Sequence, residues 1–256
     1  MSKIEQDIKQ KIETFGTPLK EWNISINYGI KTGFNEAFII DEAKKNELIA
    51  LDPKSAEIIR PILRGRDIKR YFSDWQNLYL ICTFPSLKIN IDEYPAIKKH
   101  LLYFGKERLE QTGQTHVING ERIKSRKKTT NKWFETQDSI NYWDDFNKQK
   151  IIYSETNNAN ETKIVFDEEG YFTDKTCFII TSASVNIKNL YQILSSIVFT
   201  WYMKNKSPLL GATGISLTKE LVETFPCVYS VEESIYDSYN LTEEEVMFIK
   251  NSLNIS

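Results

Sequence analysis

The chain has 256 residues, of which 41% are hydrophobic and 27% charged, and a formal net charge of −2. This composition is typical of a globular protein and excludes wholesale disorder, while apolar stretches such as 177–180 are too short to span a bilayer. The N-terminus has no signal-peptide core, and three cysteines without a C-x-x-C pair and only two histidines argue against a disulfide scaffold or a zinc site. We therefore expect a cytoplasmic protein without membrane contact.

The first half of the chain alternates short helical and strand patterns. Apolar residues at helical spacing predict helices, and alternation or short apolar runs between turn residues predict strands. Asp41 is placed to cap one helix, and Pro95 lies in the first turn of another. The expected helices cover residues 3–15, 41–49 and 93–109, and the expected strands cover 22–30, 37–40 and 78–83.

The second half begins with a polar stretch, 111–132, which lacks periodicity and which we interpret as a long loop. Residues 150–153 fit a strand, and 164–166 are expected to pair with 176–180. The strongest helical pattern covers 189–205. Together these patterns predict an α+β fold with a mixed or antiparallel sheet, formed by the 22–40, 78–83 and 150–180 strands, against which helices 93–109 and 189–205 pack.

The near-neutral net charge hides an uneven distribution. Residues 98–132 hold ten basic and three acidic side chains, a local charge of +7, and 54–70 hold six basic against two acidic. Residues 219–256 hold two basic and eight acidic side chains, a local charge of −6. A basic surface of this kind attracts phosphate backbones through counterion release.

The usual catalytic motifs of nucleotide-binding enzymes, serine hydrolases and zinc proteases are absent from the sequence. One loose pattern, Asp145 followed by Glu161-Thr162-Lys163, has the D…ExK spacing of metal-dependent nucleases. The two carboxylates would hold Mg²⁺, and the lysine would orient a water. A metal-dependent DNA nuclease therefore stays open as an alternative function, although Glu161 lies in an Asn-rich loop rather than on a clear strand.

Six segments occur in an order that resembles a known family: WNISINYGIKTGFNEAFIID (22–41), LRGRDIKRY (63–71), DEYPAIKKHL (92–101), KWFETQ (132–137), YWDDFNKQKIIYSE (142–155) and LVETFP (221–226). Together they resemble the TaqI-like C-terminal specificity domain. That domain is the target-recognition part of adenine-specific DNA methyltransferases and of fused type IIG restriction–modification enzymes.

The resemblance implies sequence-specific recognition of duplex DNA. In such enzymes a separate Rossmann-like domain binds S-adenosylmethionine and methylates a flipped adenine. Its [DNS]PP[YF] signature is absent here, since the Asp-Pro pair at 52–53 is followed by Lys54. We therefore expect a non-catalytic chain that binds no cofactor itself and acts with a methyltransferase catalytic domain or subunit, which in type IIG enzymes is fused to an endonuclease. The chain looks like a fragment, a truncated product or a detached specificity subunit.

The resemblance also implies a domain organisation. Residues 1–21 would be a helical connector, 22–226 the DNA target-recognition domain, and 227–256 an acidic helical tail. A third functional alternative, a protein-interaction module, would use the acidic tail to dock a partner subunit.

Base contacts differ with each recognition site, so candidate DNA-binding residues come from the sequence itself. Arginine suits bidentate contact with guanine, and lysine suits phosphate. The stretch 98–132 and the segment 64–70 are expected to line one groove. The alternatives are a salt-bridge cluster of Arg64 to Arg70 with Asp67 and Asp74, above all for Arg66 because its neighbour is Asp67, and a solvated insert at 111–132. The candidates are Lys31, Arg64, Arg66, Lys69, Arg70, Lys124, Arg126, Lys127, Lys128, Lys132 and Lys148.

Overall fold

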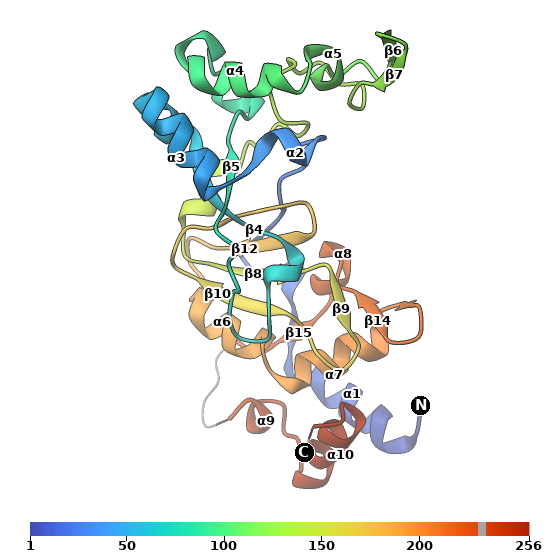
Figure 1. Ribbon diagram of the computed structural model, residues 1–256. Helices are drawn as coiled ribbons and strands as arrows, with labels where there is room; N and C mark the ends of the chain where they lie inside the picture. Colours follow the sequence, from blue (N-terminus) through green and yellow to red (C-terminus); the bar gives the residue numbers. More distant parts are fainter. Residues whose placement is uncertain (230–233, 256) are drawn as a thin grey trace. The chain divides into compact units, whose positions relative to one another are not determined.

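The chain passes four times between two units, each with its own sheet (Figure 1). A computed structural model describes residues 1–229 and 234–255. Unit 1 comprises residues 1–29, 64–74 and 145–256, and unit 2 comprises 30–63 and 75–144. The strands expected in one sheet are therefore divided between two. The α+β class is confirmed, but the single sheet is wrong.

Unit 1 is organised around an antiparallel sheet in the order β10-β8-β12-β2. All five residues of β8 and all five of β12 are buried, as in strands covered on both faces. The expected direct pairing of 164–166 with 176–180 is wrong, because β8 lies between these strands and bonds to both. The bounds are β2 (Ser25–Tyr28), β8 (Lys150–Ser154), β10 (Ile164–Asp167) and β12 (Cys177–Thr181).

The helices of unit 1 begin at side-chain caps. Helix α1 (Lys3–Phe15), confirmed as predicted, starts with a capping box between Ser2 and Glu5. The predicted helix 189–205 is two helices, α6 (Ile187–Leu194) and α7 (Ile197–Lys206). The break has a local cause: the hydroxyl of Ser196 accepts a hydrogen bond from the backbone N–H of Phe199 and starts a new helix.

Both ends of the chain pack into the core of unit 1. Ile8 of α1 and Ile249 of α10 are fully buried in the same apolar cluster, and Lys11 forms an ion pair with Glu245 at 2.7 Å. The predicted division at residues 22 and 227 stays a prediction, and residues 1–29 and 145–256 belong to one unit. Residues 230–233 and 256 of the expected tail lie outside the described residues. The remaining elements of unit 1 are β1 (Thr17–Pro18), β9 (Thr156–Asn158), β11 (Phe172–Thr173), β13 (Leu209–Leu210), β14 (Gly214–Ser216), α8 (Lys219–Val222), β15 (Pro226–Cys227), α9 (Ile235–Ser238) and α10 (Glu243–Ser252).

Unit 2 contains the antiparallel strands β4-β5-β3 and a row of helices that leads to a hairpin (Figure 1). Asp41 caps α3 as predicted. The expected strand 37–40 starts as a helical turn, and the expected helix 93–109 breaks at Gly105, whose φ of +87° suits glycine. The bounds are α2 (Asn35–Phe38), β3 (Ile39–Asp41), α3 (Glu42–Leu51), β4 (Ile59–Leu63), β5 (Leu78–Ile81), α4 (Pro95–Tyr103), α5 (Lys106–Leu109), β6 (Thr115–Ile118) and β7 (Glu121–Lys124).

Membrane-spanning helices are not found in the part of the chain that the structure describes, where each helix is too short or too polar to cross a bilayer.

Candidate nucleic-acid interface

The stretch interpreted as a long loop contains a regular β-hairpin. Strands β6 and β7 pair antiparallel, with Thr115 opposite Lys124 and Ile118 opposite Glu121. Asn119 and Gly120 form the two-residue connection, with φ of +51° and +83°. Positive φ at both positions is what a type I′ hairpin loop requires, and Asn-Gly is its preferred sequence. The Asn-Gly pair between two short alternating segments was the signal that could have predicted this hairpin.

The two faces of the hairpin differ in exposure. Residues opposite each other on antiparallel strands point to the same face, and alternate residues along a strand also share a face. His116, Ile118 and Ile123 on one face are half-buried. The other face, which we call the outer face, is exposed and carries Thr115, Val117, Arg122 and Lys124.

Arg126 has a structural role, which corrects its assignment as a DNA contact. Its side chain is 5% exposed, and four of its N–H groups donate hydrogen bonds of 2.7–2.8 Å to backbone carbonyls. Burial lowers the pKa of Arg126 to about 10, so the guanidinium stays charged at neutral pH. The sequence could not distinguish this arginine from its exposed neighbours. Its acceptors are the carbonyls of Thr32, Leu109, Trp133 and Glu135.

Gln111 reinforces the base of the hairpin from inside. Its amide nitrogen donates to the carbonyls of Lys132 and Glu135 at 3.2 and 3.1 Å, and its amide oxygen accepts from the hydroxyl of Thr129 at 2.8 Å. The segment after β7 is therefore held at several points, although its sequence resembles a solvated insert.

The other candidates in unit 2 are lysines that are exposed or half-buried. The side chain of Lys132 lies 5.5 Å from the ring centre of Phe134. Lys31 is half-buried, and its carbonyl accepts hydrogen bonds from the backbone N–H groups of Gln137 and Asp138. Exposed cations at the base and along the hairpin are Lys124, Lys127, Lys128 and Lys132.

The candidates between residues 64 and 70 belong to unit 1. The guanidinium of Arg64 forms a bidentate pair with the buried carboxylate of Asp67, with both N–O distances 2.8 Å. The alternative of a salt bridge with Asp67 is therefore confirmed for Arg64, whereas Arg66 is exposed. Arg66 and Asp67 are adjacent in a short 3₁₀ turn, and Arg64, three residues before Asp67, reaches the carboxylate.

A cluster of two half-buried basic residues and two exposed aromatic residues follows this turn. Lys69 donates to the carbonyl of Arg66 at 2.8 Å, and the guanidinium of Arg70 lies 5.0 Å from the ring centre of Tyr71. Tyr71 and Phe72 are 54% and 60% exposed. Because residues 64–70 and 98–132 belong to different units, their common groove stays a prediction.

Substitution of Arg64 should lower the stability of the protein, whereas substitution of Arg66 should weaken its binding to DNA. Arg64→Ala should lower the free energy of unfolding by about 1–3 kcal/mol, because it removes two hydrogen bonds from a buried carboxylate. Arg66→Ala should change it by less than about 0.5 kcal/mol and should weaken binding to duplex DNA. Chemical denaturation and fluorescence anisotropy with a labelled duplex measure the two effects. Equal stability of the two variants would contradict this assignment.

Lys148 and its neighbourhood bear on the nuclease alternative. Lys148 pairs with Asp145 at 2.7 Å, and the other carboxylate oxygen of Asp145 accepts from Asn27 at 3.0 Å. Lys150, two residues further along the chain, is fully buried and forms an ion pair with Asp167, so it cannot contact a phosphate. Within residues 1–229 and 234–255, no three His, Cys, Asp or Glu side chains are grouped so that they could hold a metal ion. The geometry therefore gives the Asp145, Glu161 and Lys163 pattern no support.

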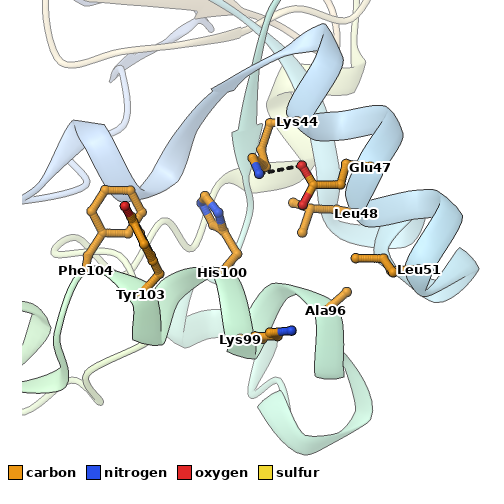
Figure 2. A pocket seen from close by; sticks show the side chains of 9 residues that line it. All are labelled: Lys44, Glu47, Leu48, Leu51, Ala96, Lys99, His100, Tyr103 and Phe104. Carbon is orange, nitrogen blue, oxygen red and sulfur yellow. Dashed lines mark hydrogen bonds and ion pairs between the residues drawn. The ribbon is translucent and has the colours of Figure 1, made fainter.

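A cavity of about 280 Å³ lies in unit 2 between α3 and α4 (Figure 2). Its walls are largely aliphatic and aromatic, and the ion pair of Lys44 with Glu47 lies at its edge. The imidazole of His100 is hydrogen-bonded to the carbonyl of Ala37 at 3.0 Å, and burial lowers its pKa. The Lys44–Glu47 pair lies within α3, and His100 of α4 is bonded to a backbone carbonyl of α2, so we assign this cavity no chemistry.

Comparison with known families decides the classification. The family model described as the TaqI-like C-terminal specificity domain matches residues 60–227. The chain belongs to this family. The matched segment spans most of unit 2 and much of unit 1, so this TaqI-like specificity domain includes both the hairpin and the 64–70 turn. The resemblance seen in the sequence is confirmed.

Two solved structures share the fold of this TaqI-like domain. The type IIL restriction–modification enzyme MmeI, solved in complex with DNA, is 16% identical with a TM-score of 0.52 over 93% of this chain. The type IIG restriction endonuclease BpuSI is 14% identical with a TM-score of 0.51 over 95% of this chain. The chain spans 29% and 27% of their lengths. No curated protein matches.

Proposed function

We propose that this chain recognises a specific sequence in duplex DNA, as the specificity domain of a restriction–modification adenine methyltransferase. The observation that carries this proposal is the match of the TaqI-like specificity domain over residues 60–227. Two restriction–modification enzymes with the same fold, one of them solved with DNA, support it.

The surface chemistry of both units fits this function. Unit 2 exposes lysines along the β6–β7 hairpin and its base, and unit 1 exposes Arg66 beside the Arg70–Tyr71 pair. Lysines at the surface can neutralise phosphates, and arginines can form bidentate contacts with guanine. Both kinds of contact are needed, because phosphate contacts position a protein on DNA and base contacts give specificity.

Methyl transfer and the S-adenosylmethionine site belong, in this proposal, to a methyltransferase catalytic domain or subunit that acts with this chain. The sequence lacks the [DNS]PP[YF] tetrapeptide that the transfer needs, since Asp52-Pro53 precedes Lys54. We place the complex in the cytoplasm, where the free, buried thiols of Cys82, Cys177 and Cys227 remain reduced.

Selection from a library of random duplexes tests the proposal. The purified chain, immobilised and washed at moderate salt, should enrich duplexes that share one short motif. A specific site typically binds 10³–10⁷ times more tightly than random DNA, so even a reduced specificity gives detectable enrichment. A library that remains random after repeated selection would contradict sequence-specific recognition by this chain.

Removing three exposed cations should reduce the salt dependence of binding. Each phosphate contact contributes about 0.9 to the slope of log K against log salt concentration. The triple variant Lys127→Ala, Lys128→Ala, Lys132→Ala, at the base of the hairpin, should therefore lower the slope by up to about 2.7. Arg126 is left unchanged because its replacement would disturb the fold.

A matched variant separates local contacts from general charge. Lys3→Ala, Lys9→Ala and Lys20→Ala together remove the same charge from exposed positions at the start of unit 1. This control should keep the salt slope of the unmodified chain. Equal slopes for the two triple variants would show that the lysines at the base of the hairpin make no phosphate contacts.

A further inference from the structure

We infer that the β6–β7 hairpin enters the major groove as a two-stranded ribbon and contacts base edges with its outer face, Thr115, Val117, Arg122 and Lys124. This inference rests on the proposed function and goes further, because it names the element that determines specificity. It follows from the shape of the hairpin, the chemistry of the outer face, and the way the base is held.

The dimensions of the hairpin fit the groove. Each strand has four residues, about 13 Å at 3.3 Å per residue, and the major groove is about 12 Å wide and 8.5 Å deep. The two-residue loop keeps the tip narrow. Nothing lies within 4 Å of the position that a Cβ on Gly120 would occupy, so the tip is surrounded by open space.

The outer face carries groups that can distinguish bases. Arg122 is exposed, and no ion pair is found for it among the described residues, so its guanidinium can form the bidentate contact that favours guanine. Val117, directly opposite, is 71% exposed, and its methyl groups can contact the methyl of thymine. Thr115 and Lys124 lie opposite each other at the base of the ribbon. The hydroxyl of Thr115 can donate or accept a hydrogen bond, and the ammonium of Lys124 can donate one.

The half-buried face of the hairpin determines which side chains are exposed on the outer face. A one-residue shift in register would exchange the outer face with the half-buried face that carries His116, Ile118 and Ile123. The Asn-Gly loop and the paired strands set this register. The four side chains of the outer face are therefore presented together rather than sampled by a mobile loop.

The base of the hairpin is held by the buried groups described above. The backbone N–H groups of Arg126 and Ser125 donate to the carbonyls of Glu110 and Gln114, both at 2.9 Å, and the N–H of Gly113 donates to the carbonyl of Arg126. The guanidinium of Arg126 then ties this junction to four carbonyls of unit 2. A recognition element fixed before binding loses less conformational freedom when it binds.

A shortened hairpin tests the inference directly. Deleting residues 117–118 and 121–122 joins His116 to Ile123 through the same Asn-Gly loop. Because two pairs are removed, the alternation of bonded and non-bonded pairs is kept. We expect this variant to bind duplex DNA but to enrich no motif from the random library, or a motif shortened at the hairpin-dependent positions. Thermal unfolding checks that unit 2 remains folded.

Single substitutions provide a second measurement that does not depend on the deletion. Thr115→Ala, Val117→Ala, Arg122→Ala and Lys124→Ala are all exposed changes. Loss of a base contact should reduce discrimination at one position by roughly 5- to 150-fold. Glu121→Ala, on the other face of the same hairpin, is the control and should select the original motif.

The outcomes separate the inference from the proposed function. If the unmodified chain enriches a motif, and the shortened hairpin and all four substitutions select the same motif with the same discrimination, the hairpin inference is overturned and the proposed function stands. If the unmodified chain enriches no motif, the proposed function itself fails. If the shortened variant unfolds, the four substitutions decide.

Discussion

Replacing Arg126 by methionine should lower the free energy of unfolding by about 3–5 kcal/mol. Methionine fits the buried space but donates no hydrogen bond, so the carbonyls of Thr32, Leu109 and Trp133 would lose the hydrogen bond from Arg126, while the carbonyl of Glu135 keeps one from Gln111. An unsatisfied buried polar group costs about 1–3 kcal/mol, and partial entry of water reduces the sum. Urea denaturation followed by circular dichroism measures the loss.

The neighbouring Lys127→Met is the matched control. It removes the same charge at an exposed position and should change stability by less than about 0.5 kcal/mol. Arg126→Lys should give an intermediate loss, because an ammonium has three donors and lacks the planar fork of a guanidinium. A methionine variant as stable as the Lys127 control would show that the buried guanidinium does not hold the base of the hairpin.

The second large effect concerns the buried ion pair of unit 1. Lys150 and Asp167 are paired with 0% and 3% side-chain exposure, and the ammonium also donates to the carbonyl of Phe146. Lys150→Met should cost about 3–5 kcal/mol, because it leaves a buried carboxylate without its cation. Asp167 still accepts from the N–H groups of Glu169 and Tyr171.

Urea denaturation of the Lys150→Met variant measures this loss. The exposed Lys148→Met is the control and should change stability by less than about 1 kcal/mol, because its ion pair with Asp145 lies at the surface. A Lys150→Met variant as stable as the unmodified chain would contradict the requirement for a buried cation beside Asp167.

The regular helices of this chain could be predicted because their signals are local. Helix α1 has apolar residues at helical spacing and a Ser2 cap, and α3 begins at Asp41. The helix expected over 189–205 was too long because the apolar periodicity continues across Ser195 and Ser196. A single hydrogen bond from the N–H of Phe199 to the hydroxyl of Ser196 starts a second helix there, and the periodicity gives no sign of it. Periodicity in a sequence predicts which face of a helix is buried. It does not predict where a side-chain hydroxyl replaces an intrahelical backbone hydrogen bond and the helix breaks.

The long-range features could not be predicted in the same way. The order β10-β8-β12 depends on which apolar strands pack into one core. The sequence shows that each of these strands is apolar, but it does not show which strand lies next to which. Among the basic residues of 124–132, Arg126 is buried because it donates hydrogen bonds to backbone carbonyls of other segments, such as those of Thr32 and Glu135. The hairpin could have been predicted from the Asn119-Gly120 pair, but the polar residues around this pair led us to interpret 111–132 as a loop.

The four passages of the chain between its units have a consequence for exchanging DNA specificities between proteins. Unit 2 is encoded as two separated pieces, and the 64–74 segment between them belongs to unit 1, where the N–H of Gly65 donates to the hydroxyl of Thr176. A continuous transplant of residues 30–144 would carry that segment away from the residues it packs on. A hybrid gene therefore needs two matched inserts with four junctions, which makes a new specificity easier to reach by point substitutions on the existing hairpin than by recombination.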